Sequence, residues 1–540
     1  MMEDTKTDTP VAQPEPTASK DFWSVPAGAG LQVPEKAVAT LVWRADKGAD
    51  TAGEDAATDA TAPSTTAPAT TAPATTAPAA GPASITYKAE AGHVDVRDDT
   101  GKLLCKMFYV SYVALGADGE ADPDRPVTVL FNGGPGSASV PIDFGGFGPL
   151  RVQTDGMRHV RADAAVTDNP HTLLKVSDLV FFDAPGTGYS PVAAGVDSKE
   201  IFGADGDADA FCRATTAWLE DNGRWSSPLY LLGESYGTVR NAVLMRLMGE
   251  RGVKLTGVTM LSAIWDWVET LPGEDLYYLG MLPTFAATAQ YFGKAGAGVD
   301  VDEWFDRAMA FSTEVYGPAL LFGDRLGAER EAELAQQISE LIGLPADFVL
   351  ARHLRVSLED FRARILEREG KVCGRLDMRF VCDAPSYQQQ SVDWLAGEDA
   401  ADSSLNGVWD HAFRAFLHDR LGYAAPARYL DSNYMKIGTK WNWTHQAPGT
   451  MEEVGAPNFA IDLACALRRD PTIKLCVLGG RYDAATPYWN VEHDLACQYL
   501  SDELKERVEF HRYGCGHMAY TDEPTLAAMD ADLTAFYAKK

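Results

Sequence analysis

One segment near the middle of the chain constrains the fold more than any other. Residues 229–232 are apolar and predict a short buried strand, which runs directly into the pentapeptide Gly-Glu-Ser-Tyr-Gly at 233–237. Glycines on both sides of a serine allow a turn so sharp that the hydroxyl projects beyond the end of the sheet. Residues 238–248 then have the composition of a helix. Strand, turn and helix together predict a nucleophile elbow with Ser235 as the reactive residue.

Two later segments supply a base and a carboxylate for this serine. An apolar strand is predicted at 474–480, and it is followed by Asp483 in a loop. A second strand, predicted at 507–513, is followed by His517 between glycine-rich residues. The chain order Ser235, Asp483, His517 is that of the α/β-hydrolases and differs from the orders of the chymotrypsin and subtilisin folds. We therefore expect these three residues to form a catalytic triad.

A glycine-rich loop upstream of the elbow is the candidate oxyanion hole. Residues 126–131 predict a strand that runs into Asn-Gly-Gly-Pro-Gly-Ser at 132–137. Glycines leave a backbone N–H free to face a developing negative charge, and proline stiffens the turn that holds this donor. A loop after a strand that precedes the elbow is where an α/β-hydrolase places such a donor.

These motifs and one other resemble the serine carboxypeptidases, over a stretch from about residue 85 to the C-terminus. The motifs are Asn-Gly-Gly-Pro-Gly at 132–136, Asp-Ala-Pro-Gly-Thr-Gly-Tyr-Ser at 183–190, the elbow at 233–237, residues 480–483 and Gly-His-Met at 516–518. The resemblance is greatest to the bacterial branch, which also shows Leu-Pro-Thr, here at 282–284, and Gly-Arg-Leu-Asp, here at 374–377. It implies an α/β-hydrolase fold and removal of C-terminal amino acids from peptides. It also implies Ser235 as nucleophile, His517 as base, Asp483 as its orienting acid, and the N–H groups of Gly134 and Tyr236 as the oxyanion hole.

The resemblance further implies a site for the free carboxylate of the peptide substrate. Asn132, Gly133 and Glu234 match the family positions that hold this group. A second glutamate, which in the family is the partner of the first, is replaced by Gly146 in this sequence. An esterase or acyltransferase on the same scaffold therefore stays open as an alternative. A non-catalytic binding protein is a further alternative, and the complete triad argues against it.

Composition narrows the possible partners and cofactors. A formal net charge of −30 argues against nucleic acid and against an anionic membrane surface as partners. No apolar run approaches the roughly 20 residues that span a bilayer. The eight cysteines form no tight Cys-x-x-Cys pair, so we expect no zinc site, and the triad needs no metal or organic cofactor. Residues 1–20 contain no apolar signal region, which favours a cytoplasmic protein unless a leader has been removed.

The expected organisation is an α/β core interrupted by an insertion. Residues 1–19 predict a disordered tail, and the first part of the core covers 20–265. Within that part, an Ala/Thr/Pro-rich loop at 46–84 connects strands predicted at 37–44 and 85–89 and cannot order itself by burying apolar surface. Residues 266–447 contain mainly helix signals and are expected to form a cap over the site. Residues 448–540 complete the core.

Overall fold

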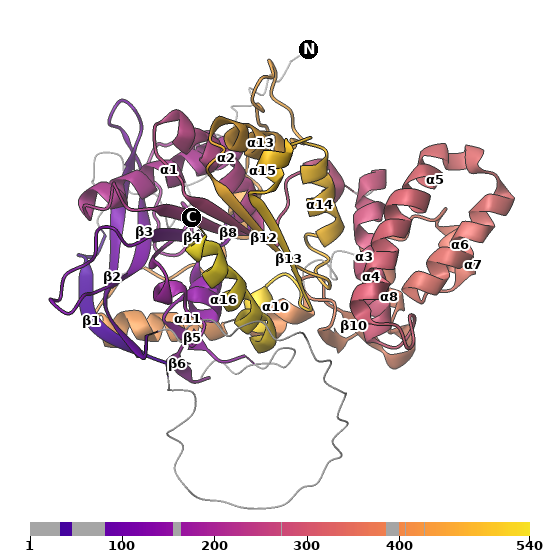
Figure 1. Cartoon of the computed structure of the whole chain (residues 1–540), viewed down its shortest axis with the longest axis horizontal. Helices are drawn as coiled ribbons and strands as arrows, with labels where there is room; N and C mark the ends of the chain where they lie inside the picture. Colours follow the sequence, from indigo (N-terminus) through magenta and orange to yellow (C-terminus); the bar gives the residue numbers. More distant parts are fainter. Residues whose placement is uncertain are drawn as a thin grey trace, which may run out of the picture.

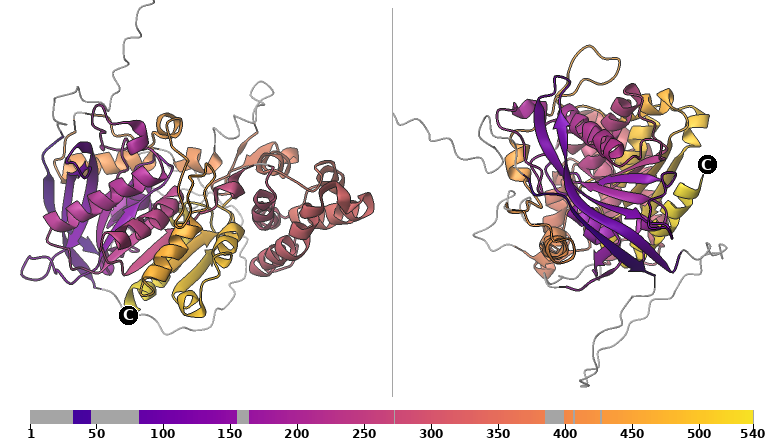
Figure 2. Two further views of the ribbon diagram at one scale, coloured as in Figure 1. Left: turned by 90° about the horizontal axis from the view of Figure 1, so that it is seen from above. Right: turned by 90° about the vertical axis from the view of Figure 1, so that its left-hand side faces the viewer.

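The fold is built on one large, mostly parallel sheet with helices on both faces (Figures 1 and 2). The computed structural model describes residues 33–45, 82–154, 164–271, 273–384, 399–405, 407–425 and 427–539. The tail predicted at 1–19 and nearly all of the loop predicted at 46–84 lie outside these residues. In sheet order, the strands are β1 (Ala37–Arg44), β2 (Ser84–Arg97), β3 (Leu103–Ala114), β7 (Asp178–Phe182), β4 (Val127–Phe131), β8 (Leu229–Glu234), β9 (Gly257–Leu261), β12 (Lys474–Gly480) and β13 (Val508–Tyr513).

The sheet has an antiparallel edge and a parallel centre. Strands β1, β2, β3 and β7 pair antiparallel, whereas the strands from β7 through β4, β8, β9 and β12 to β13 pair parallel. Strands β4, β8, β9 and β12 are buried along their whole length, as expected for parallel strands covered on both faces. The carboxyl ends of parallel strands lie at one edge of the sheet, so the loops after β4, β8, β12 and β13 meet there.

The strands predicted at 37–44 and 85–89 form an antiparallel pair, in which Ala37 faces Ala91 and Arg44 faces Ser84. Two small sheets accompany the main one: β5 (Leu150–Val152) with β6 (Val166–Asp168), and β10 (Lys371–Cys373) with β11 (Val381–Asp383).

Each face of the sheet has its own hydrophobic cluster. Helices α1 (Ala204–Asp221), α2 (Tyr236–Glu250) and α13 (Ala460–Arg469) contribute to the cluster on one face. Helix α16 (Glu523–Ala538) contributes to the cluster on the other. The core also contains α12 (Tyr434–Gly438), α14 (Tyr488–Ala496) and α15 (Asp502–Lys505). This is the α/β-hydrolase fold predicted from the sequence.

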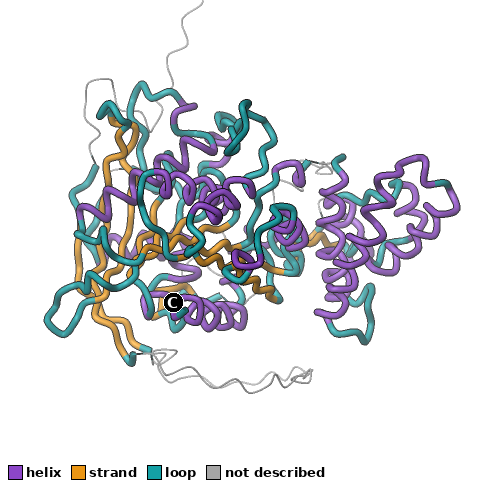
Figure 3. Tube along the Cα trace, turned by 45° about the horizontal axis from the view of Figure 1, so that its top comes forward, coloured by secondary structure: helices purple, strands orange, loops and turns teal. Residues whose placement is uncertain are grey.

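The region expected as a single cap, residues 266–447, divides into two parts. Its first part is a helical lobe at 275–364, which projects to one side of the core (Figures 1 and 3) and packs around its own hydrophobic cluster. The helices of the lobe are α3 (Asp275–Tyr291), α4 (Val301–Phe311), α5 (Gly317–Phe322), α6 (Ala328–Ile342), α7 (Ala346–Ala351) and α8 (Leu358–Arg364).

The second part of that region does not belong to the lobe. Helices α10 (Ala400–Leu405) and α11 (Val408–Ala415) share a hydrophobic cluster with sheet residues such as Leu130 and Leu232. The buried apolar side chains of α11 belong to this cluster and not to the cluster of the lobe. Only the lobe therefore behaves as an insertion with a hydrophobic cluster of its own, and Ala484 and Trp489 join that cluster from the core.

Candidate active site

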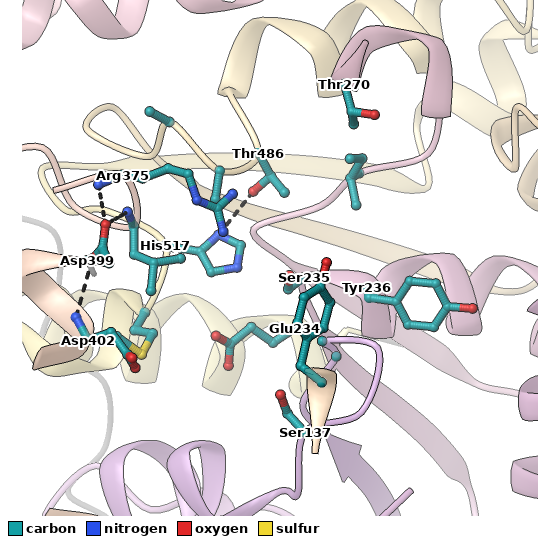
Figure 4. Close-up of a pocket in the computed structure, with 18 of the residues that line it drawn as sticks. Ser137, Glu234, Ser235, Tyr236, Thr270, Arg375, Asp399, Asp402, Thr486 and His517 are labelled. Atoms are coloured by element: carbon teal, nitrogen blue, oxygen red, sulfur yellow. Dashed lines mark hydrogen bonds between the residues drawn. The ribbon is translucent and has the colours of Figure 1, made fainter. Parts of the chain in front are cut away.

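Ser235 occupies the turn between β8 and α2. Its backbone has φ 58° and ψ −128°, a conformation that non-glycine residues rarely adopt. A side chain at Gly233 would approach the carbonyl oxygen of Gly237 to 2.4 Å, so the turn can close only with glycine there. The N–H of Ser235 donates to the carbonyl of Leu261 at 2.9 Å, which ties the elbow to β9. The predicted elbow is present, and it presents Ser235 to a large pocket (Figure 4).

A buried aspartate orients His517 at the same edge of the sheet. Asp483 Oδ2 lies 2.7 Å from His517 Nδ1, and both side chains are buried. The other oxygen of Asp483 accepts the N–H groups of Ala485 and Thr486 at 2.8 and 2.9 Å. Since Nδ1 donates to the carboxylate, Nε2 is left as the base. Burial works against a charge on His517, yet the carboxylates of Asp483 and Glu234 outweigh it, so the pKa of His517 is raised above its ordinary value.

Thr486 is part of this arrangement and was missed from the sequence. Its hydroxyl lies 2.7 Å from Asp483 Oδ2, 3.2 Å from His517 Nδ1 and 3.0 Å from the carbonyl of Ser262. Its position three residues after the aspartate was the only available signal.

The histidine loop is held by the Gly-Arg-Leu-Asp motif at 374–377. The N–H of His517 donates to the carbonyl of Leu376 at 2.6 Å, and the N–H of Gly516 donates to Asp377 at 3.0 Å. A side chain at Gly516 would come within 2.4 Å of Asp377, so only glycine allows this approach. Asp377 is paired in turn with Arg379 at 2.7 Å. The family resemblance includes this motif but does not say which part of the structure it contacts.

The glycine-rich loop after β4 packs directly against the elbow. A side chain at Gly133 would lie 2.5 Å from the backbone nitrogen of Tyr236, so the two backbones touch. The N–H of Tyr236 lies at this contact, and Gly134 follows Gly133 in the chain; neither the N–H of Tyr236 nor that of Gly134 donates to an acceptor within the described residues. Tyr236 also begins α2, whose positive N-terminal end favours negative charge. The geometry suits an oxyanion hole at the two predicted donors.

A buried ion pair anchors the glycine-rich loop from behind. Arg240 on α2 and Asp207 on α1 are joined at 2.6 Å, with side chains 0% and 2% exposed. Arg240 also donates to the carbonyl of Asn132 at 2.9 Å, and its guanidinium lies 4.0 Å from the ring centre of Phe211. The pair therefore connects two helices to the first residue of the loop.

We expect Asp207→Asn to lower the free energy of unfolding by about 3–5 kcal/mol, because it leaves the Arg240 charge buried without its partner. Chemical denaturation measures the loss. Asp209→Asn on the same helix is the matched control. Asp209 is about a quarter exposed where it pairs with Arg213, so we expect a loss of at most about 1 kcal/mol. Equal losses for both variants would contradict the anchoring role of Asp207.

Glu234, the residue before the nucleophile, is buried beside the pocket and has two hydrogen-bond donors. Asn132 Nδ2 donates to Glu234 Oε2 at 2.6 Å, and the hydroxyl of Tyr520 donates to the same oxygen at 2.9 Å. Asn132 Oδ1 accepts the N–H of Ile142 at 3.0 Å, which fixes its orientation. Burial raises the pKa of Glu234 to about 7, although both donors act to lower it. The Glu234 carboxyl is therefore neutral at acidic pH and ionised at alkaline pH, and it titrates near neutral pH.

Tyr520 takes the place of the second glutamate. A side chain at Gly146 would lie 3.2–3.3 Å from the Tyr520 ring, so the absence of a side chain at 146 makes room for this ring. The structure supplies a phenol from the short helix η10 (Ala519–Thr521), 286 residues after Glu234. No sequence signal connects Tyr520 with Glu234 across that separation.

These residues open onto one pocket of about 1500 Å³. Its lining includes Ser235, His517, Glu234, and residues of the helical lobe such as Tyr277 and Ser357. Figure 4 shows Ser235 and His517 facing the same space, with Glu234 below them. Within the described ranges, no group of three or more His, Cys, Asp or Glu side chains is placed to hold a metal ion. Nor does any helix described there have the length and apolarity to cross a membrane.

The fold is that of the α/β-hydrolases. A family model described as serine carboxypeptidase matches residues 78–251. Serine carboxypeptidase-like 36 of Arabidopsis thaliana is 29% identical over 157 residues, which is 29% of this chain and 29% of that protein. The pheromone-processing carboxypeptidase KEX1 of Saccharomyces cerevisiae is 30% identical over 103 residues, covering 18% of this chain and 13% of KEX1.

The solved structure of KEX1 has a similar fold. It superposes with a TM-score of 0.51 at 14% identity, and covers 83% of this chain and 91% of that one. The match to the family model and to these curated relatives agrees with the resemblance to the serine carboxypeptidases on which the sequence analysis relied. The sequence match to the two curated relatives named above spans less than a third of their length.

Proposed function

We propose that the protein is a serine-type carboxypeptidase that releases the C-terminal amino acid of peptides. Ser235 Oγ attacks the carbonyl carbon of the terminal peptide bond, and His517 Nε2 takes the hydroxyl proton. The negative oxygen of the tetrahedral intermediate accepts the N–H groups of Gly134 and Tyr236. His517 then returns the proton to the leaving amine, which breaks the C–N bond and leaves an acyl group on Ser235. Water, activated by His517, hydrolyses this ester and frees the enzyme.

The observation that carries the proposal is the Asn132–Glu234–Tyr520 group, which adjoins the nucleophile. An amide N–H and a carboxylic acid can both donate to a carboxylate, so Asn132 and protonated Glu234 would hold the substrate's C-terminus one residue from the attacked bond. Burial strengthens these hydrogen bonds and keeps Glu234 neutral below about pH 7. The helical lobe, whose residues line the pocket, would then act as the cap predicted from the sequence.

A comparison of three substrates tests this function. We expect blocked dipeptides with a free C-terminal carboxylate to be hydrolysed at least tenfold faster, in kcat/KM, than the same dipeptides with an amidated C-terminus. A short aryl ester, which lacks the carboxylate, should be hydrolysed but should not depend on Glu234. Amino-acid release is followed by chromatography. If the amidated dipeptides are cleaved as well as the free acids, exopeptidase specificity is wrong.

One observation favours the alternative of an esterase or acyltransferase. The hydroxyl of Tyr520, and not a second carboxyl group, is hydrogen-bonded to Glu234. The site therefore lacks the pair of glutamates that, by the family resemblance, holds the carboxylate of the substrate. Rapid ester turnover without any release of amino acids from free-carboxylate dipeptides would support that alternative. If a fluorophosphonate probe failed to label Ser235 in the folded protein, both enzymatic functions would be excluded.

A further inference from the structure

Another part of the pocket contains two buried carboxyl groups without a cationic partner. Glu269, in the short helix η4 (Trp267–Thr270), and Asp494, on α14, are 5% and 2% exposed, and both line the pocket. Within the described part of the chain, no Lys, Arg or His is among the groups that shift the pKa of Glu269 or Asp494. The charged groups near each of these two carboxyls are the other one and Asp266. Burial raises the pKa of both groups, so they resist ionisation while no cation is present.

Two acceptor atoms in this part of the pocket also lack hydrogen-bond donors. Glu269 Oε1 and Asn490 Oδ1 are buried and accept no hydrogen bond from the described residues, although the Glu269 carboxyl also interacts with the Asn490 and Asp494 side chains. Asn490 is 7% exposed and lies on the same helix as Asp494, one turn before it. Unsatisfied buried acceptors are costly and uncommon in native proteins. A ligand that carries several N–H donors would satisfy them.

Aromatic rings line the approach to these carboxyl groups. Trp267 and Trp443 stack with ring centres 4.3 Å apart, and Trp267 meets the Tyr236 ring edge-on at 6.4 Å. All three residues line the pocket. Aromatic faces pack well against the methylene stem of a long basic side chain, and they attract its charge. The wall therefore suits a chain that is apolar along its length and cationic at its tip.

This group of residues lies away from the proposed carboxylate site. Figure 4 shows Thr270, the neighbour of Glu269, on the opposite side of Ser235 from Glu234. If Glu234 holds the carboxylate of the last residue, the residue before the scissile bond extends toward Glu269. The charge of the pocket as a whole also favours a cation, since ten of the described residues that line it carry carboxyl groups and three carry guanidinium groups.

We propose that Glu269 and Asp494, with Asn490, bind the charged side chain of a lysine or arginine at the position that precedes the scissile bond. This inference rests on the proposed carboxypeptidase function and specifies the class of peptide that the site accepts. The substrate's ammonium or guanidinium group supplies the missing cation and the missing donors. Charge-assisted hydrogen bonds to a buried carboxylate are the strong kind, so the preference is expected to be large.

The test compares two dipeptides that differ at this position. Benzyloxycarbonyl-Lys-Ala and benzyloxycarbonyl-norleucyl-Ala have side chains of similar length, and only the lysine carries a charge. We expect kcat/KM to favour lysine by at least tenfold. Glu269→Gln and Asp494→Asn should each reduce this ratio about tenfold while leaving turnover of the norleucine peptide within about twofold, which also shows that the variants fold. Glu367→Gln, which neutralises an exposed carboxylate that also lines the pocket, should leave the ratio unchanged.

The results separate the two proposals. If the norleucine peptide is cleaved as fast as the lysine peptide, or if both variants keep the wild-type ratio, the cationic site is wrong and the carboxypeptidase function stands. If neither dipeptide is cleaved, the carboxypeptidase function has failed. The cationic site is then judged by calorimetry with Nα-acetyl-lysine methylamide and its norleucine analogue. Tenfold tighter binding of the lysine compound retains it, and equal affinities overturn it.

Discussion

Ser235→Ala is expected to lower kcat/KM for peptides and esters by more than 10³-fold while leaving the fold intact. The hydroxyl is half-buried at the elbow and contributes little packing, so its loss removes the nucleophile and almost nothing else. His517→Ala should cause a comparable loss, because members of a triad act as a unit. Steady-state kinetics measure both effects, and circular dichroism with thermal unfolding checks the fold.

Variants of Asp483 and of its neighbour Thr486 provide a matched comparison for this prediction. Asp483→Asn keeps the size of the side chain but favours the wrong tautomer of His517, so activity should also fall steeply. Thr486→Val removes one hydroxyl donor to Asp483 and leaves the Asp–His hydrogen bond in place. We therefore expect it to be far milder than Asp483→Asn. Retention of more than about a tenth of wild-type activity by Ser235→Ala or His517→Ala would show that the triad is wrongly assigned.

Glu234→Gln is expected to raise KM for free-carboxylate peptides about ten- to a hundredfold below pH 7, with little effect on esters. The variant replaces the carboxylic acid O–H that would donate to the substrate with an amide N–H, a weaker donor, and so loses up to the roughly 1.5–3 kcal/mol of that charge-assisted hydrogen bond. Glu359→Gln, elsewhere on the pocket wall, should leave KM for peptides nearly unchanged. Equal losses on peptide acids, amides and esters would mean that Glu234 only supports the elbow.

The pH dependence makes this prediction sharper. The pKa of Glu234 is raised to about 7, so the group is neutral and donates below that pH, and is charged and repels the substrate carboxylate above it. Wild-type KM for peptide acids should therefore rise above about pH 7, whereas KM of Glu234→Gln should stay flat. The ratio of kcat/KM for a peptide acid to that for an ester cancels the titration of His517, which affects both substrates.

Tyr520→Phe tests the origin of that pKa. The Tyr520 hydroxyl donates to Glu234 and so favours its charged form, which lowers the pKa against the effect of burial. Its removal should move the rise in KM to higher pH, and a merely structural tyrosine would not shift the profile. A shift to lower pH would contradict the proposed role of the phenol.

The sequence was sufficient to predict the elbow and the loops that carry the proposed triad, because local backbone chemistry determines them. Glycine is the only residue that fits at 133, 233 and 516, since a side chain there would collide with backbone or with Asp377. Because only glycine is tolerated at these positions, the segments around them form short motifs that can be recognised from the sequence alone. Buried strands next to those motifs, such as β8 and β12, then predict that Ser235, Asp483 and His517 follow strand ends at one edge of a parallel sheet. The strands predicted at 37–44 and 474–480 have the bounds observed for β1 and β12.

Contacts between distant segments were decided only by the tertiary structure. Tyr520 reaches Glu234, and Arg240 reaches the carbonyl of Asn132, across separations of 286 and 108 residues. A phenol or guanidinium has no local backbone requirement, so nothing around it in the sequence reveals its partner. The same reason explains why helices α10 and α11 were assigned to the cap: an apolar helix face indicates burial, but only the packed structure shows which surface buries it.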